Sequence, residues 1–205
     1  MTLTRATGAL LALLALGCVP MTAFDKLPQR SMSPRLAYRG FSFDRPTSPS
    51  WYLLQSEQEF THVTLRRDGL AGEAHSFYAL VSLGAIDRQP ASHEEFAELA
   101  RVDQEAPYTV RTVAYEQKLV TRQNQWCMRF DSTHAVLGAP PAPDRELTMV
   151  MHGYRCLHPT WEKVTLDFFY SERGVANDLD PALAAEGETF LEGVRIDVAP
   201  DTPAS

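Results

Sequence analysis

The chain has 205 residues, of which 44% are hydrophobic and 22% are charged, and these proportions are typical of a globular protein with one hydrophobic core. Its formal net charge is -7, with 26 acidic and 19 basic side chains. A surface of that sign repels phosphate backbones, so nucleic acid is excluded from the partners that we expect.

The first predicted element is a short apolar segment that ends at a cysteine. Residues 9–18 read ALLALLALGC and follow a single basic residue, Arg5. This segment is too short to cross a bilayer as a helix, which needs about 20 residues, but it matches the apolar region of a secretory signal. We therefore predict that residues 1–17 are a signal peptide that is removed from the mature protein.

The residues ALGC at positions 15–18 resemble the lipobox of bacterial lipoproteins, although Ala15 stands where that pattern prefers Leu. The resemblance implies a lipoprotein in which Cys18 is the first mature residue and carries acyl chains. Each buried methylene contributes about 0.8 kcal/mol, so the membrane becomes a partner through this anchor. Val19 replaces the Asp that signals inner-membrane retention, which implies the outer membrane, facing the periplasm. The alternative is a conventional signal peptide that leaves a free thiol at residue 18.

The segment that follows the cysteine lacks any regular spacing of apolar residues. Residues 18–39 contain prolines at positions 20, 28 and 34. We predict that this segment is a tether between the lipid and a single domain that spans residues 40–196. Residues 197–205 are expected to be a flexible tail.

Several stretches after the tether have the alternating or continuous apolar pattern of β-strands. They are residues 40–46, 51–56, 60–69, 75–86, 108–136, 146–159 and 161–174. The stretch at 75–86 is the most continuous apolar run, so we expect it to be a buried central strand. The stretch at 108–136 is long enough for one or two strands.

Two further segments carry the signals of helices. Ser92 and Glu95 form a capping box, which predicts a helix within residues 87–102. Asp180 as the cap and Pro181 as the first helical residue predict a second helix within residues 178–196. The apolar stripe of the second helix consists of Leu183, Ala184, Gly187, Phe190, Leu191 and Val194. Its acidic residues lie mostly outside this stripe and are interpreted as a solvated face: Glu186, Glu188 and Glu192.

The order of these elements predicts an α+β domain in which an antiparallel sheet packs with two helices. Over residues 40–196 this order is similar to that of the Mog1/PsbP group of α/β/α sandwiches. The stretch FSFDRPTSPSWYLLQ stands where those domains have an opening strand, a proline-containing turn and a second strand led by Trp. The resemblance implies a non-enzymatic binding or assembly module with a protein partner.

Two cysteines remain if Cys18 carries lipid, and an oxidising compartment favours a disulfide between them. Cys127 and Cys156 lie in strand-like segments on either side of VLGAPPAPDR, which cannot continue a strand and therefore predicts a hairpin turn. If the two cysteines pair directly, the centre of the hairpin falls between Pro141 and Ala142, within that turn. Directly opposed residues are close enough for a disulfide.

Motifs for common enzyme mechanisms are missing from the sequence. It contains no G-x-S-x-G elbow, no P-loop, no dinucleotide glycine fingerprint and no H-E-x-x-H. We therefore expect no catalytic residue, no cofactor and no metal. The hairpin register nevertheless places Asp131 opposite His152, so a hydrolase-type enzyme that uses this pair is an alternative.

Two hypotheses require the cysteines to be in reduced form. A periplasmic metal site would combine Cys156 with His152 and His158. A nucleophilic pair would combine Cys127 or Cys156 with His134 or His158.

The segment YRCLHPTWEK is the candidate recognition surface. A disulfide would make the end of this strand rigid. Aromatic side chains that are already ordered lose little conformational entropy when a partner binds. The candidate residues are Arg155, His158 and Trp161. The alternative is that His158 and Trp161 cap the core.

Overall fold

The computed structural model describes residues 34–46, 50–55, 61–68, 70, 74–101, 109–139 and 142–197. The predicted signal peptide, the predicted lipidation site Cys18, most of the predicted tether and residues 198–205 of the predicted tail lie outside these ranges. No helix among the described residues is long and apolar enough to cross a membrane.

Most of the described chain forms β-strands. In chain order these are β1 (Arg35–Tyr38), β2 (Phe41–Asp44), β3 (Trp51–Gln55), β4 (His62–Arg67), β5 (Ser76–Ala85), β6 (Val110–Arg122), β7 (Gln125–Val136), β8 (Leu147–Leu157), β9 (Val164–Gly174) and β10 (Arg195–Ile196). The helices are α2 (His93–Leu99), the 3-10 turn η3 (Ala176–Asp178) and α3 (Pro181–Gly193).

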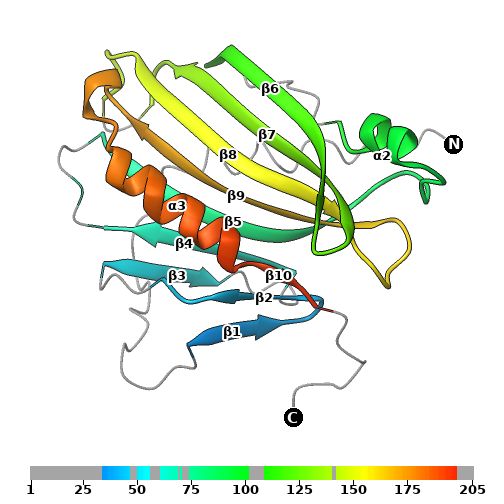
Figure 1. The fold of residues 1–205 in the computed structure, drawn as a ribbon. Coiled ribbons are helices and arrows are strands. Elements are labelled where there is room, and N and C mark those ends of the chain that lie inside the picture. The colour runs from blue at the N-terminus through cyan, green and yellow to red at the C-terminus, as the bar shows by residue number, and fades with distance from the viewer. Residues whose placement is uncertain are drawn as a thin grey trace, which may run out of the picture.

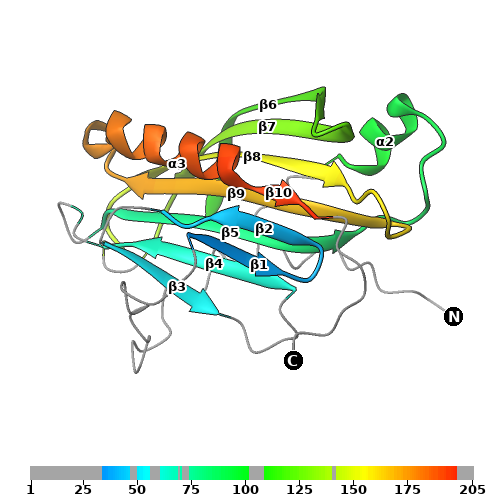
Figure 2. The same ribbon diagram turned by 60° about the horizontal axis from the view of Figure 1, so that its bottom comes forward.

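The strands form two sheets in which neighbouring strands are antiparallel (Figure 1). The larger sheet has the order β3-β4-β5-β9-β8-β7-β6, and the smaller has the order β1-β2-β10. Helix α3 and the smaller sheet cover the same face of the larger sheet, as both views show (Figures 1 and 2). We call this the α3 face, toward which Phe168 and Tyr170 of β9 point, and we call the other the opposite face, toward which Phe169 points.

The main core lies between the α3 face and the elements that cover it. Phe43 of β2 and Phe190 of α3 are buried there with Phe77 of β5 and Phe168 of β9. The rings of Phe43 and Phe190 meet edge to face, with centroids 5.8 Å apart. Each buried aromatic side chain removes about 150–250 Å² from water, so this layer supplies a large part of the hydrophobic stabilisation. The predicted central position of β5, between β4 and β9, is confirmed.

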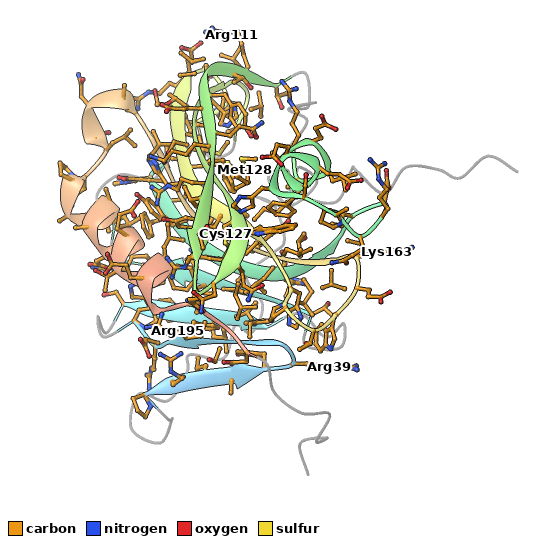
Figure 3. All side chains as sticks on the ribbon, turned by 45° about the vertical axis from the view of Figure 1, so that its right-hand side comes forward. Arg39, Arg111, Cys127, Met128, Lys163 and Arg195 are labelled. Carbon is orange, nitrogen blue, oxygen red and sulfur yellow. A yellow bond between two sulfur atoms is a disulfide. The ribbon has the colours of Figure 1, made fainter. Side chains whose placement is uncertain are left out.

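Helix α2 packs against the opposite face. Phe96 is fully buried in a cluster with Ile86, Met128 and Leu157. Met128 follows Cys127 on β7, and successive side chains on a strand point to opposite faces (Figure 3). One helix therefore packs on each face of the larger sheet, and the α+β class with an antiparallel sheet and two helices is confirmed.

Both helices begin where the sequence predicts. The Ser92 hydroxyl accepts a hydrogen bond from the Glu95 N–H at 3.2 Å. The Glu95 carboxylate accepts from the N–H of Ala91 at 2.7 Å, one residue before the partner that a capping box normally uses. The Asp180 carboxylate accepts from the Ala182 N–H at 2.8 Å, which begins α3.

The predicted boundary between tether and domain differs from the structure. Residues 35–38, placed in the tether, form β1 and pair with β2. The Tyr38 ring stacks on Phe41 and Phe43 at centroid distances of 5.2 and 5.8 Å. Gly40, the predicted start of the domain, occupies the turn between these strands with φ of 81°. The strand has only four residues, which is too short to show an alternating apolar pattern in the sequence. Its position depends instead on the packing of Tyr38 against the two Phe rings.

The hairpins of the larger sheet follow the predicted register. Residues 108–136 contain two strands, joined at Gln123 and Asn124, which both have positive φ, as in a type I′ turn. Strands β7 and β8 pair with Cys127 opposite Cys156. The two cysteines form the predicted disulfide, with Cα atoms 4.0 Å apart, and both are fully buried (Figure 3).

Gly187 allows α3 to lie directly against β9. A Cβ atom at this position would lie 2.5 Å from ring carbons of Tyr170. Overpacking outweighs the gain in helix propensity, so we expect Gly187→Ala to lower the free energy of unfolding by about 1–2 kcal/mol, measured by urea denaturation. The exposed Ala185→Gly variant is the control and loses only about 1 kcal/mol of helix propensity. A Gly187→Ala protein more stable than the native one would contradict this packing.

Candidate functional site

A cluster of polar side chains lies beside α3 on β7, β8 and β9. Asp131 is opposite His152, as predicted, and its Oδ1 is 2.5 Å from Nδ1 of His152. Arg129 donates to the Asp131 carboxylate at 3.1 Å and to Glu188 of α3 at 2.9 Å. The Tyr170 hydroxyl also donates to Glu188, at 3.1 Å. These five residues, which we call the polar cluster, connect three strands to the helix.

The acidic residues of α3 do not all form a solvated face, which corrects the sequence interpretation. Glu188 belongs to the polar cluster. Glu186 accepts hydrogen bonds from Nε of Arg67 at 3.2 Å and from Nε1 of Trp51 at 3.0 Å. Glu192 is exposed. Glu186 and Glu188 flank the apolar stripe, so each reaches a cation on the sheet and fastens one side of the helix.

The C-terminal end of α3 is held by the hairpin of β6 and β7. Nη2 of Arg122 donates to the carbonyl oxygens of Leu191 at 2.5 Å and Val194 at 3.2 Å. The same guanidinium lies over the rings of Tyr154 and Phe168, 5.0 and 5.3 Å from their centroids. A cation at this end complements the partial negative charge of the last carbonyls of a helix.

Burial and hydrogen bonding act in opposite directions on the acids of the polar cluster. Burial alone would raise the pKa of Asp131, but hydrogen bonds from His152 and Arg129 outweigh it and hold this pKa below its ordinary value. Burial would also raise the pKa of Glu188, but the hydrogen bonds from Arg129 and Tyr170 outweigh it and lower this pKa. Burial and the Glu188 carboxylate raise the pKa of Tyr170, so its hydroxyl stays a donor.

The lowered pKa values predict an acid-sensitive attachment of α3. The ordinary pKa values are 3.8 for Asp131 and 4.5 for Glu188, and both are depressed in the folded state. Their stabilisation is therefore complete above about pH 4.5 and is lost as the pH falls through the folded pKa values. We expect the free energy of unfolding, measured by urea denaturation from about pH 6 to about pH 3, to fall less steeply for Glu188→Gln than for the native protein.

The exposed Glu192→Gln variant is the control for this pH series, because it removes the same charge from the same helix. We expect its pH dependence to match that of the native protein. Equal slopes for Glu188→Gln and Glu192→Gln would show that the polar cluster does not set the acid response.

His152 of the polar cluster has unused hydrogen-bonding capacity. Its Nδ1 contacts Asp131, while its Nε2 forms no hydrogen bond within the part of the chain that the structure describes. The His152 side chain is 30% exposed and that of Asp131 is 36% exposed. A carboxylate that orients a histidine through Nδ1 and leaves Nε2 open is the arrangement of a general base.

A pocket of about 460 Å³ opens at the start of α3. The residues that line it are Arg67, Leu70, His75, Asp178, Leu179, Asp180, Pro181 and Leu183. Nε2 of His75 lies 2.7 Å from Oε1 of Glu172, and the same oxygen accepts from the Asp180 N–H. The described residues around this pocket include none from the polar cluster, so a ligand bound there would not lie against Asp131 and His152.

Two of the candidate recognition residues are involved in internal contacts. His158 is 2% exposed, and its ring stacks on Trp161 with centroids 4.3 Å apart. Its Nε2 donates to the Gly40 carbonyl at 3.2 Å, and its Nδ1 accepts from the Trp161 N–H at 3.2 Å. Burial lowers the pKa of His158, which keeps the ring neutral. The structure thus places both side chains over the turn of β1 and β2, as caps of the core.

The third candidate recognition residue, Arg155, lies in a buried ion pair on the opposite face. Its Nη2 donates to Asp167 at 2.7 Å and its Nε donates to the same carboxylate at 3.0 Å. The side chains of Arg155 and Asp167 are 18% and 6% exposed. Burial lowers the pKa of Arg155, but the adjacent carboxylate outweighs burial and raises it. Nη1 also donates to the carbonyl of Ala100, just after α2.

The two hypotheses that require a reduced cysteine are wrong. Cys156 is bonded to Cys127, so neither can supply a thiolate to a metal or to a nucleophilic pair. Within the described ranges no group of three or more His, Cys, Asp and Glu side chains is placed to hold a metal ion. His134 is buried, and its Nε2 lies 3.0 Å from the Ser132 hydroxyl.

Comparison with known proteins shows similarity in structure alone. No family model matches the sequence, and no curated protein matches it significantly. A cyanobacterial PsbP (CyanoP) from Synechocystis sp. PCC 6803 is 11% identical, with 80% of this chain and 91% of that chain covered and a TM-score of 0.40.

A crystal structure from Bacteroides thetaiotaomicron VPI-5482 is 9% identical, with 77% of this chain and 45% of that chain covered and a TM-score of 0.38. The matched part of this chain therefore spans less than half of the Bacteroides protein. At these values neither similarity assigns a function to this chain.

Sequence reasoning found the pair at the centre of the polar cluster and missed the residues around it. Asp131 and His152 followed from the hairpin register alone. Arg129 precedes Asp131 by two residues, so strand alternation puts both on one face, and this signal was available. Glu188 and Tyr170 carried no such signal, because their contact depends on where α3 lies on the sheet.

Proposed function

We propose that this protein is a lipid-anchored binding or assembly module of a bacterial cell envelope. In this proposal Cys18 attaches it to the outer membrane, facing the periplasm, and the folded domain acts by contact with a protein partner. The observation that carries the proposal is the buried disulfide between Cys127 and Cys156. Disulfides of this kind form in oxidising compartments such as the periplasm and are rare in the cytosol.

The contacts of the polar cluster support a structural role for Asp131 and His152 rather than a catalytic one. Asp131 is engaged by both His152 and Arg129, and Arg129 is engaged by Glu188 of α3. Cross-strand pairs and helix-to-sheet ion pairs of this kind hold elements together. Neither Asp131 nor His152 lines the pocket at the start of α3, so a substrate bound in that pocket would not contact the pair.

The intact mass of the mature protein extracted from membranes tests this proposal. We expect a chain that begins at Cys18, carries acyl chains on that residue and exposes two alkylatable thiols only after reduction. A Cys18→Ser variant is the matched control, and it is expected to appear without acyl mass. An unacylated native protein, or thiols at Cys127 and Cys156 that react before reduction, would overturn the proposed location.

A hydrolase is the second candidate function, and the open Nε2 of His152 favours it. Its test is the hydrolysis of p-nitrophenyl acetate and p-nitrophenyl phosphate by the native protein and by His152→Gln. Activity that is present in the native protein and lost in the variant would support the hydrolase. A native rate equal to that of buffer would count against the hydrolase.

A further inference from the structure

An arginine on the opposite face of the larger sheet lacks the partners that the other buried arginines have. Arg173 lies near the end of β9, and strand alternation puts its side chain on the same face as Phe169. Its Nε is buried, yet it forms no hydrogen bond with any described residue. None of the ion pairs among the described residues includes it. The residue as a whole is nevertheless partly exposed, so the buried Nε does not lie deep in the core.

The contrast with Arg155 on the same face shows what is missing. Arg155 is paired with Asp167 through two hydrogen bonds. Burial lowers the pKa of Arg173, and the nearby Tyr78, which acts in the opposite direction, does not offset the effect of burial. A charged group that is removed from water without a partner is costly, and an anionic ligand that supplied the missing charge would offset this cost.

The neighbours of Arg173 are hydroxyl and apolar groups. The register places Ser76 of β5 and Met149 of β8 directly beside it. Ser171 lies two residues earlier on the same strand, and Tyr78 is paired with Ser171 on β5. None of these neighbours is acidic. The nearest acid on this face of β9 is Asp167, six residues away, which corresponds to about 20 Å along a strand.

We propose that Arg173 is the centre of an anion-binding site on the opposite face, which takes a carboxylate or a phosphate group. The guanidinium matches the geometry of either anion with two parallel hydrogen bonds. The hydroxyl groups of Ser76, Tyr78 and Ser171 are the further donors at this site. The site goes beyond the proposed envelope function and does not depend on the lipid anchor.

Titration of the full chain with sodium phosphate or sodium acetate, at constant ionic strength set with chloride, tests the site. The readout is the NMR signal of the Arg173 Nε–H and the backbone amides of β9. We expect saturable shifts in the native protein and at least tenfold weaker binding by Arg173→Met. Arg111→Met is the matched control, because Arg111 is exposed at the outer end of β6, and it should bind as the native protein does (Figure 3).

A second variant and a second measurement separate binding from folding. Arg173→Lys keeps the charge without the planar fork, so it should bind more weakly than the native protein and more tightly than Arg173→Met. In urea denaturation, phosphate should raise the unfolding midpoint of the native protein but not that of Arg173→Met. Native binding that is absent, or that is unchanged in Arg173→Met, would overturn the proposal.

Matched pairs of probes distinguish the sources of the anion. Decanoate is compared with acetate, and a short-chain phosphatidic acid is compared with inorganic phosphate. Tighter binding of the probes with acyl chains, dependent on Arg173, identifies the head group of an amphiphile. Equal binding within each pair identifies a small free anion. Binding of the acyl probes that persists in Arg173→Met would show that Arg173 is not the anion site.

Discussion

Loss of the disulfide between Cys127 and Cys156 is expected to lower the free energy of unfolding by about 3–4 kcal/mol. The two cysteines are 29 positions apart, so the bond closes a loop of intermediate length and restricts the unfolded chain. Both sulfurs lie in the main core, where no solvent reaches them. The measurement is urea denaturation of the native protein with and without reductant, compared with the Cys127→Ala, Cys156→Ala double variant.

Cys18→Ser is the control for the disulfide, because it removes a cysteine without removing either partner of the bond. Its stability should equal that of the native protein, and reductant should destabilise both to the same degree. Reductant should have no effect on the double alanine variant. If reductant leaves the native unfolding midpoint unchanged while mass spectrometry shows two free thiols, the disulfide does not stabilise the domain.

Removal of one partner from the buried ion pair is expected to have an effect of similar size. Asp167→Asn leaves the Arg155 guanidinium buried without a carboxylate, and breaking a buried pair in this way costs about 3–5 kcal/mol. Asp167 is 6% exposed, so water cannot replace the lost partner without local opening. The measurement is the free energy of unfolding from urea denaturation.

Two controls define this result. The Arg155→Met, Asp167→Leu double variant removes both charges, and we expect it to recover most of the loss. Glu146→Gln breaks the ion pair between Glu146 and Arg111, whose side chains are 56% and 69% exposed, respectively. Because this pair lies in solvent, the variant should change the free energy of unfolding by less than about 0.5 kcal/mol. A double variant as unstable as Asp167→Asn would mean that the carboxylate has a role other than neutralising Arg155.

Local sequence signals determined those parts of the fold in which the interacting residues are close along the chain. The proline-rich turn between β7 and β8 fixed one register, and that register gave both the disulfide and the opposition of Asp131 and His152. Asp180 and Pro181 marked the start of α3, because a helix cap depends on its own first turn. Alternating apolar residues identified β9 as a strand for the same reason, although the strand is buried on both faces.

Only the tertiary structure decided which polar groups of α3 meet polar groups of the sheet. Glu186 and Arg67 are 119 residues apart along the chain, and Glu188 and Arg129 are 59 residues apart. A helical wheel places both acids at the edge of the apolar stripe, but it cannot show which arginines they contact. The internal contacts of His158 and Arg155 could not be predicted locally either, because burial depends on the elements that fold over a strand. The sequence by itself determined strands, caps and the hairpin register, which are local. The placement of α3 and the pairing of its acids with arginines of the sheet required the packed domain, because hydrophobic burial sets the position of a helix and side-chain contacts follow from it.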